Sequence, residues 1–352
     1  MTEGATQPSE QSAGSNRRLA ELIGGYQVSA AIGALARLGV ADALADGPAT
    51  STELAASLGA DEDALARLLD TIQDIGLFTL GNDGRYCLTA FGSLLRDDVP
   101  GSLRRYAVVS TDQWRWYAYG HLTHTLRTGE PGLVAAHGCG FWDYLASHPE
   151  TAASFEESLA RIGAARDQAL VASVDLSGSH CVVDVGGGRG GLLSALLAAH
   201  PRLRGVLFDL PGVIEGAREQ MREADLAERC EIIAGDFREG VPSGGDAYLL
   251  SWILHDWDDP TARRILARCR AVMDEGARLL VVEMVIPEGD DPSALAFKHL
   301  VRQADLEMLA VVGGRERTAG GFERLLNQSG FALTRIVPLK GMPWSVVEGA
   351  AV

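Results

Sequence analysis

The segment VVDVGGGRGG at residues 182–191 joins an apolar run that contains an acid to five glycines and one arginine. Gly186, Gly188 and Gly191 have the spacing G-x-G-x-x-G, which fits a loop folded under a dinucleotide pyrophosphate. Glycines let a backbone approach a ligand closely, and a helix N-terminus behind them offers free N–H groups and a partial positive charge. That charge suits a carboxylate as well as a phosphate, so the loop alone leaves NAD and a phosphate-free adenosine ligand open. No Gly-Lys-Ser/Thr follows, which excludes the kinase-type phosphate loop.

Polar residues also follow the next apolar runs of the sequence. Asp209 comes 23 residues after Gly186, where a carboxylate can accept both hydroxyls of an adenosine ribose. Asp236 and Phe237 offer an acceptor and an aromatic face that suit an adenine amine and ring. The corresponding positions after the remaining runs hold Ser251, His255, Asp256 and Glu283. Ligands of an open α/β sheet bind outside the carboxyl ends of its strands, so we expect these side chains to line one site.

Each of these features has a plainer explanation when it is taken alone. A glycine loop is a weak sign of a nucleotide, and aspartates such as Asp209, Asp236 and Asp256 commonly cap helices. A single histidine such as His255 is more often a hydrogen-bonded structural residue than a base. The combination is more specific, because acids or a histidine follow five successive apolar runs.

The elements that must position these residues are predicted from about residue 167 onwards. Short apolar runs alternate there with helical segments, which indicates parallel strands covered on both faces. FALTRIVPL and WSVVEGAAV are separated only by residues 340–343, too few for a crossover helix. We therefore expect a doubly wound, Rossmann-like α/β sheet with an antiparallel last strand. Because an ordinary dinucleotide-binding sheet ends in parallel strands, this expectation favours the phosphate-free ligand.

The first hundred residues predict a winged-helix layout. PATSTELAASLG and DEDALARLLDTIQDIGLF indicate two short amphipathic helices, and TLGNDGRYCLT indicates a hairpin after them. The helix at Asp61–Asp74, which would recognise DNA in such a layout, carries five acids and a single base, Arg67. Phosphates would be repelled there, so protein contact or dimerisation is the better interpretation.

Residues 101–165 look helical and contain the aromatic cluster QWRWYAYGHLTH. Trp114 and Tyr117 are three residues apart and would share a helix face, either in a core between domains or subunits or as a wall for a flat aromatic ligand. His121 and His124 could meet on one face, but we find no carboxylate or cysteine to complete a metal site and expect none.

The bulk composition narrows the class of protein. At 352 residues two domains are expected, and a net charge of −16 argues against a nucleic-acid partner. Five scattered cysteines without a C-x-x-C pair are typical of a reducing cytoplasm. The polar N-terminus is no signal peptide, and no apolar stretch approaches the roughly 20 residues that span a bilayer. We expect a cytoplasmic protein without a membrane partner.

Residues 182–342 resemble the small-molecule O-methyltransferases that depend on S-adenosylmethionine, a group with plant caffeic-acid-type enzymes and bacterial polyketide and antibiotic tailoring enzymes. The matching stretches are VVDVGGGRGG, GDF, LHDWDD and GGRERT, and the N-terminal region resembles that family's dimerisation domain. The resemblance implies a homodimer. The expected domains are a disordered tail (1–16), a winged-helix-like dimerisation domain (17–100), a helical linker and substrate-pocket segment (101–165) and a cofactor-binding catalytic domain (166–352).

The resemblance also implies roles for individual residues. The cofactor S-adenosyl-L-methionine, which leaves as S-adenosyl-L-homocysteine, would be held by Asp184, Gly186, Gly187, Gly188, Asp209, Asp236, Phe237 and Ser251. Ser251 stands where plant members have a lysine. The catalytic set would be His255 as base with Glu283, Glu316 and Asp256 beside it. The substrate pocket would be lined by Trp142, Phe155, Leu159 and Val311.

The expected reaction is methyl transfer to a hydroxyl, with a phenolic hydroxyl favoured, on an aromatic natural-product intermediate. A phenol with a pKa near 10 is mostly protonated at neutral pH, so a nearby histidine would remove its proton as the oxygen attacks the methyl carbon in line. No metal is required. The alternatives are a nitrogen acceptor, a hydroxylation or decarboxylation on the same fold with the same cofactor, and a DNA-binding regulator that senses a small ligand.

Overall fold

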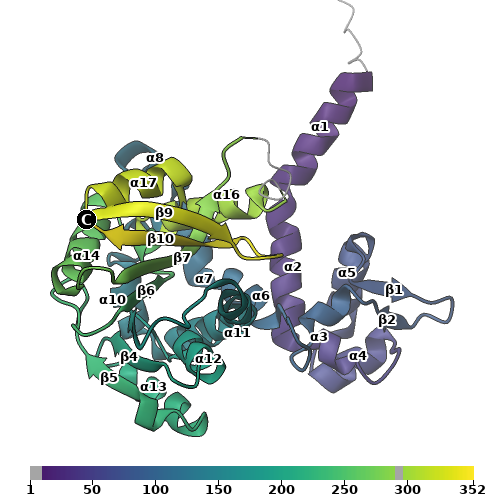
Figure 1. Cartoon of the computed structure of the whole chain (residues 1–352). Coiled ribbons are helices and arrows are strands. Elements are labelled where there is room, and N and C mark those ends of the chain that lie inside the picture. The colour runs from purple at the N-terminus through teal and green to yellow at the C-terminus, as the bar shows by residue number, and fades with distance from the viewer. Residues whose placement is uncertain (1–9, 290–295) are drawn as a thin grey trace, which may run out of the picture. The chain divides into compact units, whose positions relative to one another are not determined.

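The computed structural model describes residues 10–289 and 296–352 of the chain (Figure 1). The chain divides into two compact units, one formed by Met1–Gln113 with Ser154–Arg161 and the other by Trp114–Ala153 with Ile162–Val352. Each unit has hydrophobic clusters of its own.

The first unit is mostly helical and carries a small hairpin. Its helices are α1 (Glu10–Ile23), α2 (Gly25–Leu38), α3 (Val40–Ala43), α4 (Ser51–Leu58), α5 (Glu62–Ile72) and α6 (Arg104–Ser110). The hairpin predicted from TLGNDGRYCLT is confirmed, because β1 (Phe78–Leu80) pairs antiparallel with β2 (Tyr86–Leu88). The short helical turns η1 (Gln73–Ile75) and η2 (Gly92–Leu95) lie on either side of the hairpin.

The two helices before the hairpin begin at residues that cap them. The Thr50 hydroxyl accepts the N–H of Glu53 at 3.2 Å, and the Glu53 carboxylate accepts the N–H of Thr50 at 2.8 Å. Asp61 accepts the N–H of Ala64 at 2.9 Å. These bonds satisfy backbone donors that the first helical turn leaves free. The predicted order of helix, helix and hairpin is therefore confirmed.

The expectation of a disordered tail at residues 1–16 is wrong for the part that the structure describes. Residues 1–9 lie outside the described residues, and α1 already begins at Glu10. Arg17 and Arg18 lie 3.9 Å and 3.6 Å from Glu21 one turn later, a spacing that supports an exposed helix.

The segment Gly14–Leu38 is, by length and composition, apolar enough to cross a membrane, which corrects the expectation that no stretch approaches this limit. Its apolar residues lie on two helices rather than in one uninterrupted run. Leu19, Leu22 and Ile23 are between 58% and 68% exposed. Core helices of soluble proteins and signal sequences reach the same length and composition, so the segment by itself assigns no membrane contact.

The second unit surrounds its sheet with helices (Figure 1). They are α7 (Gln113–Gly120), α8 (Leu122–Thr128), α9 (Gly132–His137), α10 (Phe141–Ser147), α11 (Pro149–Ser173), α12 (Gly191–Ala199), α13 (Ile214–Glu223), α14 (Asp259–Val272), α16 (Lys298–Glu307), the π-helix η5 (Met308–Val312) and α17 (Ala319–Asn327). Helix α11 contributes residues to both units.

The sheet has the expected doubly wound topology. Its strands are β3 (Cys181–Val185), β4 (Arg204–Asp209), β5 (Cys230–Ala234), β6 (Ala247–Ser251), β7 (Arg278–Ile286), β9 (Phe331–Pro338) and β10 (Trp344–Ala351), in the order β5-β4-β3-β6-β7-β10-β9. Strands β3 to β7 pair in parallel, and β10 runs antiparallel to both β7 and β9. The antiparallel last strand is confirmed. It lies between β7 and β9 rather than at the edge, and a short strand β8 (Arg317–Thr318) pairs with the end of β7.

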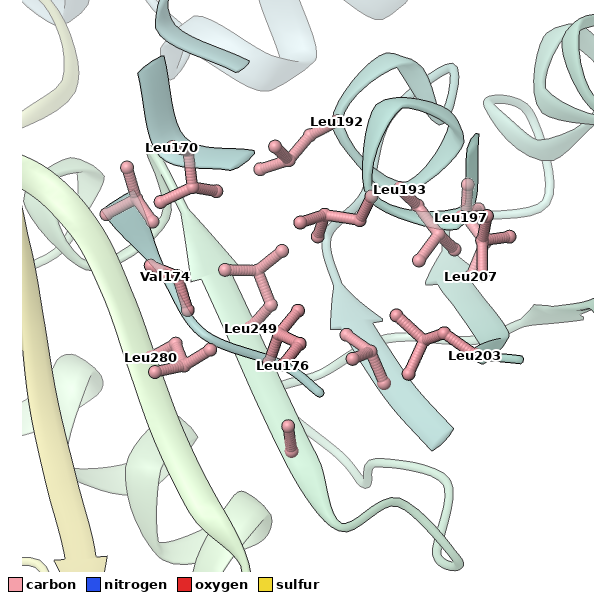
Figure 2. Close-up of a cluster of buried hydrophobic side chains, with 14 of the residues drawn as sticks. Leu170, Val174, Leu176, Leu192, Leu193, Leu197, Leu203, Leu207, Leu249 and Leu280 are labelled. Carbon is pink, nitrogen blue, oxygen red and sulfur yellow. The ribbon is translucent and has the colours of Figure 1, made fainter. Parts of the chain in front are cut away.

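The strands are covered on both faces, as their continuous hydrophobicity predicts. Val182 of β3 belongs to one buried cluster, and its neighbour Val183 belongs to the cluster on the opposite face. Figure 2 shows part of the first cluster, with labelled side chains of Leu170, Val174, Leu176, Leu192, Leu193, Leu197, Leu203, Leu207, Leu249 and Leu280. Each fully buried side chain of this size contributes about 1.5–3 kcal/mol, so the two layers hold the strand ends in fixed positions.

Candidate active site

The glycine loop between β3 and α12 requires glycine for two reasons. Gly186, Gly188 and Gly190 have φ angles of 74°, 58° and 84°, in the region that favours glycine. A Cβ on Gly187 would lie 2.7 Å from Asp184 Oδ2, closer than a real Cβ approaches another atom. The loop therefore leaves bare backbone beside a carboxylate, with a helix N-terminus directly behind it.

Asp184 is a buried carboxylate with one oxygen unsatisfied. It lies inside β3, one residue before the strand ends, and is 1% exposed. Among the described residues its Oδ2 accepts no hydrogen bond. The pKa of Asp184 is raised to about 7, mainly by burial and also by the charges of Asp167 and Asp209, while the charge of Arg166 opposes the rise. A buried carboxylate in this state favours a cationic ligand group.

Arg166 and Asp167 on α11 are residues that the sequence analysis missed. Arg166 Nε and Nη2 both donate to Asp167 Oδ1, at 2.9 Å and 2.6 Å, and the guanidinium lies 3.8 Å from the ring centroid of Trp252. Trp252 follows β6 with a φ of 58°, which costs backbone strain in a residue other than glycine. No motif or periodicity in the sequence marks these contacts.

Asp209 lies beside the glycine loop, as the prediction of a shared site requires. Its Oδ2 accepts the N–H of Gly188 at 2.8 Å, and its Oδ1 accepts the N–H of Leu210 at 2.6 Å. Burial raises the pKa of Asp209, and the two backbone hydrogen bonds oppose that rise. The end of β4 and the loop after β3 are thereby tied together.

Asp236 and Phe237 follow β5 at the position that was predicted, but the Asp236 carboxylate is already occupied in part. Its carboxylate accepts two hydrogen bonds from Arg238 Nε, at 3.0 Å and 2.9 Å. The Phe237 ring lies 6.2 Å from that of Trp257, at 83°. Arg238 was missed although it directly follows GDF, where an opposite charge two residues after an aspartate signals a local pair. Ser251, the last residue of β6, has a buried Oγ without a partner among the described residues.

His255 lies in the turn η4 (Leu254–Asp256) that follows β6, and the predicted acids surround it. His255 Nδ1 lies 2.9 Å from Glu316 Oε1, and its backbone N–H donates to Glu283 Oε1 at 3.0 Å. His255 Nε2 lies 3.5 Å from Asp256 Oδ1. The side chain of His255 is 15% exposed. The structure thus brings together four residues from three distant segments of the sequence.

Glu283 does not follow its strand, which corrects the expected position. Strand β7 continues to Ile286 because it pairs with β10, where Ser345 is the partner of Glu283. β6 ends earlier, at Ser251. Glu283 is therefore fully buried within a strand, and it still contacts the turn after the neighbouring strand.

The protonation states of His255 and the acids around it depend on one another. Burial disfavours a charged imidazole, but the charges of Glu316 and Asp256 and the hydrogen bond to Glu316 together raise the pKa of His255 to about 10. Burial raises the pKa of Glu283 to about 7 and that of Asp256 to about 6, while the His255 charge opposes both shifts. His255 therefore holds a proton at neutral pH, and the groups titrate as a coupled set.

The GGRERT segment holds the histidine turn in place. A Cβ on Gly314 would lie 1.9 Å from the carbonyl oxygen of His255, and the N–H of Arg315 donates to that oxygen at 2.8 Å. Arg317, which is 4% exposed, donates to the carbonyl oxygen of Leu254 at 2.8 Å. The sequence analysis recognised this motif but assigned a role only to its glutamate. The close backbone approach explains its second glycine.

Trp114 and Tyr117 of α7 differ in burial. Trp114 is 2% exposed, with its ring 5.6 Å from that of Phe141, whereas Tyr117 is 55% exposed. Their spacing of three residues therefore does not give them a shared environment. Trp114 is buried within the second unit, and its role in a core between domains or subunits stays a prediction.

The four residues predicted to line the substrate pocket lie in different environments. Trp142 on α10 is 46% exposed and Val311 in η5 is 2% exposed. Phe155 and Leu159 are half-buried on the part of α11 that belongs to the first unit. Their common role in lining the substrate pocket stays a prediction.

The histidines considered as metal ligands have other contacts. His121 Nδ1 lies 2.9 Å from the carbonyl oxygen of Tyr117, and His124 Nε2 lies 2.8 Å from Glu130 Oε2, a nearby carboxylate that the sequence analysis did not count. Within residues 10–289 and 296–352, no group of three or more His, Cys, Asp or Glu side chains is arranged to hold a metal ion.

Two family models match the chain. The O-methyltransferase domain matches residues 119–332, and the O-methyltransferase dimerisation domain matches residues 20–98. The chain belongs to the O-methyltransferase family. It is an S-adenosylmethionine-dependent O-methyltransferase with the methyltransferase fold and a helical N-terminal dimerisation domain, as the resemblance implied.

Individual relatives are similar to this chain over nearly its full length. The phenazine O-methyltransferase PhzM of Lysobacter antibioticus is 40% identical, covering 91% of this chain and 92% of the relative. An 8-amino-8-demethylriboflavin N,N-dimethyltransferase of Streptomyces davaonensis is 35% identical over 90% and 89%. The crystal structure of NcsB1 from neocarzinostatin biosynthesis, in complex with S-adenosylmethionine and 2-hydroxy-5-methyl naphthoic acid, superposes with a TM-score of 0.80 at 35% identity over 92% and 96%.

The residues at the strand ends fit this cofactor. The unsatisfied, buried Oδ2 of Asp184 suits the ammonium group of a methionine, and the glycine loop leaves no side chain in the way. Neither feature requires a phosphate.

Proposed function

We propose that this enzyme methylates a phenolic hydroxyl of an aromatic natural-product intermediate, with His255 as the base. The observation that carries the proposal is the contact of 2.9 Å between His255 Nδ1 and Glu316 Oε1 at the end of β6. A carboxylate on one ring nitrogen fixes the orientation of the imidazole and leaves the other nitrogen to face a substrate hydroxyl. Asp256 Oδ1, at 3.5 Å, is too distant to occupy that nitrogen with a good hydrogen bond.

Proton affinity supports the same assignment. Burial disfavours the charged imidazole, but the charges of Glu316 and Asp256 raise the pKa of His255 above its ordinary value, which makes a neutral His255 a stronger base towards a phenol. Because His255 is mostly protonated at neutral pH, the active fraction of the enzyme is expected to grow with rising pH. Glu316 stabilises the imidazolium that forms.

The geometry of the strand ends supports a role in holding the cofactor for the predicted residues. S-adenosylmethionine supplies a methyl group that a positively charged sulfur has already activated. We assign its methionine part to the loop Gly186–Gly188, with Asp184 at the ammonium, and its ribose to Asp209. Asp236 with Phe237 receives the adenine, and Ser251 lies on the same edge. Holding oxygen and methyl carbon in line can lower the barrier by roughly 7–11 kcal/mol.

A nitrogen acceptor is the second candidate, because a relative of 35% identity is named as an N,N-dimethyltransferase. The acids around His255 would stabilise a cationic amine product as well as an imidazolium. Hydroxylation or decarboxylation with the same cofactor is less well supported, because a base held between acids has no evident purpose in either reaction.

The first unit supports a homodimer in the cytoplasm. Its match to a dimerisation domain agrees with the exposed apolar side chains of Leu19, Leu22 and Ile23. All five cysteines are free thiols, as in a reducing compartment. Helix α5, with Glu62 and Asp63 in its first turn, keeps the acidic character that argues against DNA binding.

Light scattering of the full chain should give twice the mass of one chain. Leu22→Asp should shift the mass towards that of a monomer, whereas Leu126→Asp, at a 77% exposed site of the second unit, should not.

The function is tested by incubating the full chain with methyl-deuterated S-adenosylmethionine and a panel of phenols and aromatic amines. Mass spectrometry should find the labelled methyl group on oxygen of at least one phenol. A label found only on nitrogen would select the second candidate. Binding of S-adenosylhomocysteine without any labelled product would contradict methyl transfer to these acceptor classes.

A further inference from the structure

Arg238 binds the carboxylate of Asp236 from three directions. Its backbone N–H donates to Oδ1 at 2.8 Å, and its Nε donates to Oδ1 and Oδ2 at 3.0 Å and 2.9 Å. Nη2 also donates to Oδ2, at 2.5 Å. The Asp236 side chain is 19% exposed and that of Arg238 is 46% exposed, so the arginine lies on the outer side of the carboxylate. A fork of this kind fixes a carboxylate more firmly than a single donor does.

The same guanidinium also lies against the aromatic part of this region. The Arg238 Cζ atom lies 5.5 Å from the ring centroid of Trp257, which is within the range of a cation–π interaction. The Trp257 ring is in edge contact with Phe237 at 6.2 Å. Arg238 therefore binds the Asp236 carboxylate directly and is connected to the Phe237 ring through Trp257.

The charges around Asp236 come from more than one element. Hydrogen bonds from Arg238 hold the pKa of Asp236 below its ordinary value, and Arg264 on α14 lowers it further through its charge. The acids Glu239 and Asp143 face Arg238 in turn. The carboxylate is thus ionised, and the fork occupies one edge of it. The three N–H groups of Arg238 leave about one of the roughly four lone-pair sites of the carboxylate able to accept a further donor.

We propose that Arg238 is a positioning residue for the adenine: it fixes the Asp236 carboxylate so that a free lone pair accepts the exocyclic amine of the cofactor. The inference rests on the proposed function, because it uses the assignment of adenine to Asp236 and Phe237. It also predicts specificity. A hypoxanthine ring presents a carbonyl oxygen in place of the amine, and two acceptors then face each other across the contact.

The test compares the dissociation constants of S-adenosylhomocysteine and S-inosylhomocysteine by calorimetry, which needs no turnover. A hydrogen bond to a charged group contributes about 1.5–3 kcal/mol, so the wild-type chain should prefer the adenine compound by about 10- to 100-fold. Arg238→Ala should reduce this preference to about threefold or less, since an unrestrained carboxylate turns away from the ring. Arg238→Lys, which keeps the charge but loses the fork, should fall between the two. Arg264→Ala is the matched control, because it removes a nearby charge and leaves the fork intact.

The possible results of this experiment either support or contradict the role of Arg238 in positioning the adenine. An unchanged preference in Arg238→Ala, or tighter binding of S-adenosylhomocysteine by that variant, overturns the inference. Equal loss of preference in Arg264→Ala assigns the effect to charge alone and also overturns it. If the wild-type chain binds both compounds equally, Asp236 does not accept a hydrogen bond from the exocyclic amine, and the inference is wrong. A wild-type chain that binds neither compound contradicts the proposed function itself, which separates the two failures.

Discussion

Two acidic clusters lie at the carboxyl ends of the strands in the second unit, and their charge is compensated differently. The histidine cluster is formed by His255 with Glu283, Glu316 and Asp256. It contains a basic group of its own, the imidazole of His255, and two of the acids lie within 3.5 Å of the imidazole nitrogens. The loop cluster is formed by Asp184 with Asp167 and Asp209, and among the described residues the positive charge that acts on Asp184 comes from Arg166. That arginine is already bound to Asp167 and packed on Trp252.

The difference supports the separate tasks that we propose for the two clusters. A cluster that carries its own base can exchange a proton with a substrate. A cluster that leaves Asp184 Oδ2 unsatisfied favours a cation supplied by a ligand. Methyl transfer from a sulfonium compound needs both tasks, one to hold the cationic donor and one to take the proton of the acceptor.

Loss of the base should have the largest effect. His255→Ala is expected to lower kcat/KM by about 10²- to 10⁴-fold on a phenol that is neutral at the assay pH, the range typical of a general base. The dissociation constant for S-adenosylhomocysteine should stay within about threefold, because the loop cluster is intact. Steady-state kinetics and calorimetry measure the two values. His180→Ala, at a side chain that is 93% exposed, is the control. A comparable loss in both values would mean that the clusters do not act separately.

Glu316 should contribute less to the rate and should move the pH profile. Glu316→Gln keeps an acceptor near Nδ1 but removes a charge that raises the pKa of His255. Replacing a hydrogen bond to a charged group by one to a neutral amide corresponds to about a tenfold lower kcat/KM at its maximum. The rise of kcat/KM with pH should shift to lower pH, because His255 releases its proton more readily. A profile that does not move would place the titrating group elsewhere.

The loop cluster should control how cofactor binding depends on pH. The pKa of Asp184 is about 7 in the chain without a ligand, and an ammonium favours the ionised form. Binding of S-adenosylhomocysteine at pH 6 must therefore release a proton, so its affinity should rise from pH 6 to pH 8. Asp184→Asn should bind about tenfold more weakly at pH 8, with a flatter pH dependence. Calorimetry in buffers of different ionisation enthalpy counts the protons, and Asp274→Asn serves as the exposed control. A wild-type affinity without pH dependence would refute this role.

Glu283 should give the smallest effect at low pH. Its pKa is about 7, so Glu283→Gln resembles the protonated side chain already present below that pH. The variant should keep kcat/KM within about threefold of wild type at pH 6 and differ more at pH 8, where the native residue is ionised. Comparison with Glu316→Gln in the same pH series sharpens the distinction between the two glutamates. A loss that is equal at both pH values would contradict the assigned protonation.

The sequence predicted the parts of the site that belong to the strand ends. Asp209, Asp236 and His255 follow their apolar runs as a parallel sheet requires, and the short link at 340–343 predicted the antiparallel strand. Glu283 was expected after its strand and lies within it, because pairing with β10 extends β7. Hydrophobic pattern reports which residues are buried, and it does not report which partner extends a strand.

The contacts that the sequence did not reveal join residues through side chains. Arg166 reaches Trp252 from another element, and the close approach of Gly314 to His255 depends on how two loops meet. The pairing of Arg238 with Asp236 could have been predicted, since the two residues are two positions apart, but the position of Arg238 over Trp257 could not. Contacts of this kind depend on tertiary packing, which periodicity and spacing do not encode.

The central claim, that His255 takes the proton of the acceptor, is tested most directly with two phenols that differ in pKa but little in shape. One should be neutral at the assay pH and the other already ionised, and kcat/KM is measured for the wild-type chain and for His255→Ala. We predict a loss of about 10²- to 10⁴-fold on the neutral phenol and a much smaller loss on the ionised one, because the latter needs no base. An equal loss on both phenols would contradict the assignment of His255 as the base.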